Sequence, residues 1–142
     1  MTTFYLDTEF NGHGGELISM ALLRNSWDGW YGVTKITSDY DPWVAENVVP
    51  KLGQVPLEHD VFRASFVDWI SKFTNPEIIC DCHVDAMHFS QMFSGKDYAS
   101  SLDFPYRITV LKTPPGHPVS KNPHNAVDDA FALMMWHQNE SL

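Results

Sequence analysis

Two acidic residues near the start of the sequence have the spacing of a cation site. Asp7 and Glu9 lie two positions apart within Phe4–Phe10, whose alternation of apolar and polar residues predicts a strand. Side chains on a strand repeat every two residues, so both carboxylates face one side, with their Cα atoms roughly 6.6 Å apart. Two half-buried carboxylates repel each other and lose hydration, and a divalent cation removes both costs. The pair therefore predicts a cation site; the alternative is a solvent-facing strand with two exposed acids.

A second candidate acid follows a later apolar segment. Ile78–Cys82 is predicted to be a strand, and Asp85 lies in the first turn of the helix expected directly after it. In open α/β sheets, ligands bind at the edge outside the strand ends, which makes Asp85 a candidate ligand. The helix dipole alone would also favour an acid at this position. Asp81 competes for the same role, but it lies inside the predicted strand, so its direction depends on the register.

A third candidate group lies near the end of the sequence. His124 immediately precedes a predicted helix, and Asp129 follows five residues later. This spacing places an imidazole beside a carboxylate near one end of that helix. Asp129 shares a helical stripe with mostly apolar residues, namely Ala126, Ala130, Leu133 and Trp136. The small alanines would let the helix lie close to a sheet, whereas an exposed helix start with capping acids is the alternative.

The elements that must position these groups are indicated by periodicity and by turn residues. Strands are predicted at about residues 4–10, 17–23, 30–36, 78–82 and 107–111. Helices are predicted at about residues 42–49, 58–73, 84–93 and 125–137. Asp41 followed by Pro42 is typical of a helix start, and Asp28-Gly29 is typical of a hairpin turn. Residues 113–123 contain four of the nine prolines and are predicted to form a loop.

This order of elements predicts an α/β fold. Three consecutive strands indicate a meander, and the helix-linked strands that follow indicate a mixed sheet with helices packed on its faces. The strand at 4–10 is a natural central strand because it is otherwise apolar. The helix at 58–73 is predicted to pack on the core through an aromatic and aliphatic stripe, formed by Phe62, Phe66, Trp69, Ile70 and Phe73.

The composition is that of a folded, acidic domain. The chain has 142 residues, of which 44% are hydrophobic and 19% are charged, and this length fits a single domain with a substantial core. Nine Lys and Arg residues against 18 Asp and Glu residues give a formal net charge of −9. An acidic chain has no overall field that attracts nucleic acid, which argues against a general nucleic-acid coat protein. It does not exclude an enzyme whose carboxylates hold cations that in turn hold phosphates.

The cysteines and the hydropathy of the chain bear on its compartment. Cys80 and Cys82 are poorly spaced for a disulfide and too few for a zinc site, so they are predicted to be reduced thiols. The sequence has no apolar run of ~18 residues, and Met1 is not followed by a basic and then an apolar segment. These features predict a soluble, cytoplasmic protein with no membrane partner.

Taken in order, the three groups resemble the motifs of a known family. Asp7-Thr8-Glu9, then Asp85, then His124 with Asp129 five residues later resemble the DEDDh 3′–5′ exonucleases of the ribonuclease H-like superfamily. Three shorter segments resemble its compact mycobacterial-type and phage exoribonuclease group, namely Phe4–Phe10, Glu16–Ser19 and Val49–Leu52. Many members have an Asn shortly before the second-motif Asp, where this sequence reads Cys82-His83-Val84. The choice between Asp85, which is preferred, and Asp81 therefore stays open.

The resemblance implies a fold, a reaction and a cofactor. The fold would be a ribonuclease H-like mixed five-stranded sheet within one exonuclease domain spanning residues 1–142. The reaction would remove nucleoside 5′-monophosphates from single-stranded RNA 3′ ends with two Mg²⁺ or Mn²⁺ ions, which hard oxygen ligands favour over zinc. Asp7 would bridge the ions, Glu9 and Asp129 would hold the catalytic ion, and Asp85 would support the second. His124 would be the general base, since imidazole has an ordinary pKa of ~6.5.

Substrate contacts and rival functions complete the prediction. Thr8 and Phe10 are the predicted substrate-binding residues, with Phe10 either stacking on the terminal base, worth about 1–3 kcal/mol, or lying in the core. The residues do not decide between RNA and DNA, but the closer resemblance favours RNA, and it also implies a possible homodimer. An exodeoxyribonuclease and an inactive nucleic-acid-binding module are alternatives. A haloacid-dehalogenase-like phosphatase is disfavoured because it requires Asp-x-Asp, and the second acid here is Glu9.

Overall fold

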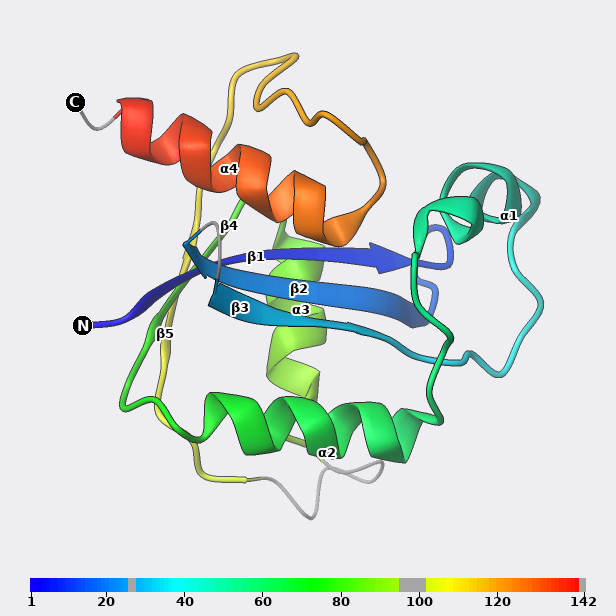
Figure 1. The fold of residues 1–142 in the computed structure, drawn as a ribbon, viewed down its shortest axis with the longest axis horizontal. Coiled ribbons are helices and arrows are strands. Elements are labelled where there is room, and N and C mark those ends of the chain that lie inside the picture. Colours follow the sequence, from blue (N-terminus) through cyan, green and yellow to red (C-terminus); the bar gives the residue numbers. More distant parts are fainter. Residues whose placement is uncertain (26–27, 95–101, 141–142) are drawn as a thin grey trace.

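The fold is built around one β-sheet (Figure 1). The computed structural model describes residues 1–25, 28–94 and 102–140. Within these ranges the strands are β1 (Thr3–Phe10), β2 (Leu17–Asn25), β3 (Asp28–Val33), β4 (Glu77–Cys80) and β5 (Arg107–Val110). The helices are α1 (Pro42–Asn47), the 3₁₀ turn η1 (Val49–Lys51), α2 (His59–Ile70), α3 (His83–Gln91) and α4 (Ala126–Glu140).

The strands lie in the order β3-β2-β1-β4-β5, so β1 is central as predicted. Strands β1, β2 and β3 pair antiparallel in sequence order, which is the predicted meander. Strand β4 pairs parallel with β1, and β5 pairs parallel with β4. The prediction of an α/β fold with a mixed five-stranded sheet flanked by helices is therefore confirmed for the part of the chain that the structure describes.

Helices cover both faces of the sheet (Figure 1). Phe4 and Leu6 of β1 face α2 and α3, and they share a cluster with the buried phenylalanines of those helices, Phe62, Phe66 and Phe89. Tyr5 of β1 faces the other way and packs against α4 through Leu133 and Met134. Because strand side chains alternate, Asp7 and Glu9 share the α4 face with Tyr5. The prediction that small residues of α4 lie against the sheet is confirmed by a cluster of three alanines, Ala21, Ala126 and Ala130.

The apolar stripe of α2 forms much of the core. Phe62, Phe66 and Ile70 are completely buried. Beyond the end of the helix, Phe73 packs edge-on against Phe4 with a ring-centroid distance of 4.9 Å, and Trp69 does the same at 5.0 Å. The prediction that this stripe is core is confirmed. It anchors the face of β1 that lies opposite the acids.

The predicted hairpin turn at Asp28-Gly29 is wrong. Strand β3 begins at Asp28, which pairs with Asn25, so the connection falls at residues 26–27, outside the described residues. Gly29 lies opposite Leu23, and a Cβ atom there would come within 2.3 Å of the Leu22 carbonyl oxygen. This glycine is therefore required by a close approach of two strands and not by a turn.

Several predicted boundaries shift where tertiary pairing decides them. Strand β4 ends at Cys80 and not at Cys82, because it runs only as far as its pairing with β1 and β5. Strand β3 ends at Val33, and α2 ends at Ile70. The predicted start of α1 is confirmed, since the Asp41 carboxylate accepts a hydrogen bond of 3.0 Å from the main-chain N–H of Trp43. The segment 113–123 contains no helix or strand, as predicted.

Candidate functional site

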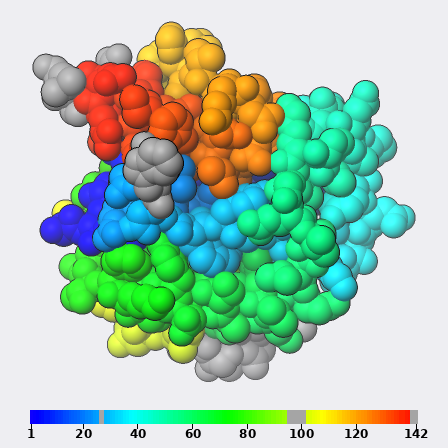
Figure 2. Space-filling model, viewed as in Figure 1, coloured from blue at the N-terminus to red at the C-terminus, as the bar shows by residue number. Residues whose placement is uncertain are grey.

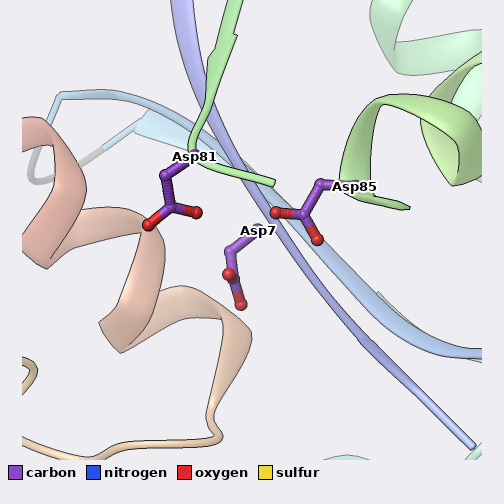
Figure 3. A group of neighbouring side chains, drawn as sticks. All are labelled: Asp7, Asp81 and Asp85. Atoms are coloured by element: carbon purple, nitrogen blue, oxygen red, sulfur yellow. The ribbon is translucent and has the colours of Figure 1, made fainter. Parts of the chain in front are cut away.

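Five carboxylates converge at the end of the central strand. They form two sets that share Asp7: one contains Asp7, Asp81 and Asp85, and the other contains Asp7, Glu9 and Asp129. Within each set, one oxygen from every residue lies within 4.8 Å of the others. Figure 3 shows Asp7 on β1, Asp81 after β4 and Asp85 on α3 turned toward a common space. The structure thus brings together all four predicted metal ligands and adds Asp81.

The pairing of β1 explains why its acids reach open space. Strand β1 pairs with β2 from Tyr5 to its end at Phe10, but it pairs with the shorter β4 only from Thr3 to Tyr5. Asp7 and Glu9 therefore extend past the end of β4, where none of the described strands covers that edge. A register irregularity between Glu9 and Phe10 ends the regular pairing with β2. This arrangement leaves the acids half-buried between the sheet and α4.

The turn from β4 into α3 supplies two further acids. Cys82 is the residue before the first helical turn, and Asp85 lies within that turn. Asp85 is only 3% exposed, and its Oδ1 accepts a hydrogen bond of 2.5 Å from the Thr8 hydroxyl. Asp81 comes directly after the end of β4 and is less buried. Both acids lie close to Asp7. The geometry therefore allows Asp81 and Asp85 alike as ligands.

The start of α4 holds the third predicted group. Asp129 Oδ2 accepts a hydrogen bond of 3.1 Å from the main-chain N–H of His124, whose φ of 73° lies in the left-handed region. The neighbouring Asp128 turns elsewhere, because it accepts from Asn122 at 3.2 Å and lies 3.5 Å from Lys121. The spacing of five residues therefore ties His124 to an acid of the site through its main chain.

The loop that carries His124 is held by a segment far away in the sequence. Lys51 Nζ donates to the Pro123 carbonyl oxygen at 2.7 Å, and the Lys51 carbonyl accepts from Asn125 Nδ2 at 2.8 Å. The ring of Trp43 on α1 meets the His124 imidazole edge-on, with centroids 5.0 Å apart. Figure 2 shows the loop before α4 lying directly against the α1–η1 segment. Lys51 therefore holds the residues on both sides of the candidate base.

The two predicted substrate contacts differ in their surroundings. The Thr8 side chain is 4% exposed and its hydroxyl donates to Asp85, so this side chain faces Asp85 and not open space. Phe10 is half-buried, and its ring lies 5.5 Å from that of His88 on α3. Farther along α3, a cavity of about 570 Å³ is lined by residues that include Met87, His88 and Gln91, and none of the five acids lines it.

Comparison with known proteins does not identify the chain. No protein-family model matches this sequence, and no curated protein matches it either. In the described part of the chain, none of the helices combines the length and apolarity needed to cross a membrane.

The prediction that Cys80 and Cys82 do not pair is confirmed, since both are free thiols. Burial, assisted by the charge of Asp85, raises the pKa of Cys80 to about 12.

Burial and mutual repulsion raise the pKa of Asp7, Glu9 and Asp85. Burial is the main cause for Asp7, whose pKa lies well above its usual range, and the charges of Asp85 and Glu9 add to it. Burial, followed by the charge of Asp129, raises the pKa of Glu9 to about 8. Burial raises the pKa of Asp85 to about 7, although hydrogen bonds from Thr8 oppose the rise. The cluster therefore retains protons near neutral pH, and a bound cation would displace them.

These shifts predict how the stability of the metal-free protein depends on pH. A carboxyl group with a raised pKa binds protons more tightly in the folded state, so its stabilising contribution is lost as pH rises through the folded value. Between pH 6.5 and 8.5, the free energy of unfolding in EDTA should fall by a few kcal/mol, since each pKa unit corresponds to about 1.4 kcal/mol. Urea denaturation at three pH values measures this fall.

The variant Glu9→Gln should reduce the fall of the free energy of unfolding with rising pH, because Glu9 has a pKa of about 8. The exposed Glu46→Gln is the matched control and should keep the wild-type slope. His88, whose pKa is lowered by burial, affects stability below this pH window and not within it. A wild-type stability that rises between pH 6.5 and 8.5 would contradict the assignment of Glu9 to a repelling cluster.

Proposed function

We propose that the protein is a metal-dependent 3′–5′ exonuclease of ribonuclease H-like fold that acts on single-stranded RNA. The observation that carries this proposal is the pair of carboxylate sets that share Asp7. Two cations held side by side by a shared acid are the recurring device of enzymes that hydrolyse phosphodiesters. The meander followed by parallel strands, with β1 at the centre, supports the ribonuclease H-like fold. The motif order of the DEDDh family supports the direction of degradation and the RNA substrate.

The acids fit divalent cations of the hard type. All candidate ligands are carboxylate oxygens, which favour Mg²⁺ or Mn²⁺. Asp7 Oδ2 is fully buried and has no hydrogen-bond partner among the described residues, which is costly unless a cation occupies the site. Asp7 would bridge two ions, with Glu9 and Asp129 on one and Asp85 on the other. When bound, such ions neutralise phosphate charge and lower the pKa of water.

The remaining residues have roles that follow from their positions. His124 would accept a proton from the attacking water as general base. Its main-chain N–H donates to Asp129, which holds the residue at the edge of the acids. The contacts from Lys51 to the residues on either side hold the loop, and with it the backbone of His124, in place before substrate binds. Phe10, directly after Glu9, would stack on the terminal base without regard to its identity.

A labelled oligonucleotide tests the proposal directly. A single-stranded RNA carrying a 5′ label should shorten one nucleotide at a time in the presence of Mg²⁺ or Mn²⁺, and the product should be nucleoside 5′-monophosphate. The ladder should be absent in EDTA, because the acids alone cannot neutralise the phosphate. Gel electrophoresis of time points measures this. The variant Asp7→Ala, purified in parallel, controls for contaminating ribonucleases.

Other outcomes of the same experiment would redirect the proposal. Faster degradation of a matched DNA oligonucleotide would favour the exodeoxyribonuclease alternative. Binding without hydrolysis would favour an inactive nucleic-acid-binding module. A single internal cut, or equal activity in EDTA, would rule out a metal-dependent exonuclease.

A further inference from the structure

We infer that Thr8 is a positioning residue that fixes the Asp85 carboxylate for cation binding. This inference rests on the proposed function, because it concerns one of the two carboxylate sets of that site. Thr8 lies between Asp7 and Glu9 in sequence, but its side chain leaves the opposite face of β1. There it meets α3 and donates its hydroxyl proton to Asp85 Oδ1 at 2.5 Å. One strand thus carries two candidate ligands on one face and the support of a third on the other.

The burial of this contact makes it consequential. Thr8 is 4% exposed and Asp85 is 3% exposed, so water cannot replace the hydroxyl at little cost. A hydrogen bond to a charged group is stronger than one between neutral groups. With Oδ1 held by Thr8, the carboxylate loses its freedom to rotate, and Oδ2 is the oxygen available to a cation. Removal of the hydroxyl would leave the buried Asp85 carboxylate with one hydrogen-bond donor fewer, so its orientation would be less strictly fixed.

Loss of the Thr8 hydroxyl should change the cation affinity of one set of acids only. Asp85 belongs with Asp7 and Asp81, whereas Glu9 and Asp129 form the other set with Asp7. Thr8 contacts Asp85 across the strand and makes no side-chain hydrogen bond to Glu9 or Asp129 among the contacts described. Loss of its hydroxyl should therefore weaken one of two cation sites and leave the other close to its original affinity. Residues that hydrogen-bond metal ligands typically contribute 10–100-fold to metal affinity.

Manganese binding without substrate tests this inference. Isothermal titration calorimetry and electron paramagnetic resonance would measure the number and affinity of Mn²⁺ ions on the full chain. In Thr8→Val, which keeps the shape and loses the hydroxyl, one site should weaken by about 10–100-fold. Thr8→Ser keeps the hydroxyl and should stay within about threefold of the wild type. Thr34→Val is the matched control, since it removes a fully buried hydroxyl that contacts Lys35 and His59 instead.

Each outcome decides the inference. Wild-type Mn²⁺ affinities in folded Thr8→Val would overturn it while leaving the exonuclease proposal intact. An equal loss in Thr8→Ser and Thr8→Val would also overturn it, because the hydroxyl would then not be the cause. If circular dichroism shows that Thr8→Val does not fold, Thr8→Ala replaces it as the variant without a hydroxyl, and wild-type Mn²⁺ affinities in that variant would likewise overturn the inference. A wild-type protein that binds no Mn²⁺ would overturn both the inference and the metal-dependent function.

Discussion

Replacement of Asp7 by alanine should abolish hydrolysis, with a loss of about 10⁴-fold or more. Asp7 is the one acid shared by both carboxylate sets, so its removal takes a ligand from each proposed ion at once. Glu9→Ala should be nearly as damaging. The double variant should be little worse than either single one, because members of a catalytic unit do not contribute independently. Single-turnover rates on a 5′-labelled RNA measure all three losses.

The fold should survive these changes, which makes the kinetic result interpretable. Asp7 has a buried oxygen without a partner among the described residues, and its charge repels those of Asp85 and Glu9. Removing it relieves that repulsion, so the variant should melt at or above the temperature of the metal-free wild type. The exposed Asp68→Ala on α2 is the control and should retain full activity. Losses that multiply across Asp7→Ala and Glu9→Ala would mean that the two acids act in separate steps.

Loss of the His124 imidazole should lower kcat by about 10²–10⁴-fold, the usual span for acid–base assistance. The affinity for Mn²⁺ should change little, because a hard cation gains little from imidazole and His124 is not a member of either carboxylate set. Asp129→Ala should instead lower the affinity for Mn²⁺.

The choice of substitution at this position follows from the backbone. His124 has a φ of 73°, a conformation that asparagine tolerates better than alanine. His124→Asn should therefore preserve the loop, and His124→Ala should be compared with it by thermal melting. If both variants lose Mn²⁺ as severely as Asp129→Ala does, the imidazole is a ligand and the base must be sought elsewhere.

Local patterns predict the elements of this protein well. The alternation around Asp7 identifies β1, and the stripe through Phe62, Phe66 and Ile70 identifies α2, because each of these patterns repeats within one element. The element ends are harder, since they depend on partners. Strand β4 stops at Cys80 where its pairing with β5 ends, and this end decides that Asp81 joins the acids. A sequence pattern contains no information about that partner.

The supports of the site are the part that sequence reasoning missed. Thr8 and Asp85 are 77 residues apart, and Lys51 meets Pro123 across 72 residues. A threonine between two acids is a weak signal, because strands favour threonine in any case. The lysine lies in a segment that resembles exoribonucleases, but the resemblance does not say what the residue contacts. Such supports follow from the packing of distant segments, and only the folded arrangement reveals them.

The two thiols at the end of β4 and just after it give the protein a built-in attachment point for spectroscopic labels. Cys80 is buried and its pKa is raised to about 12, so its sulfur stays protonated and inert toward alkylating reagents at neutral pH. Cys82 is partly exposed, and it lies between Asp81 and Asp85 at the start of α3. A maleimide fluorophore or nitroxide would therefore attach selectively beside the acids. The natural sequence thus allows cation occupancy to be followed optically or magnetically without an engineered cysteine.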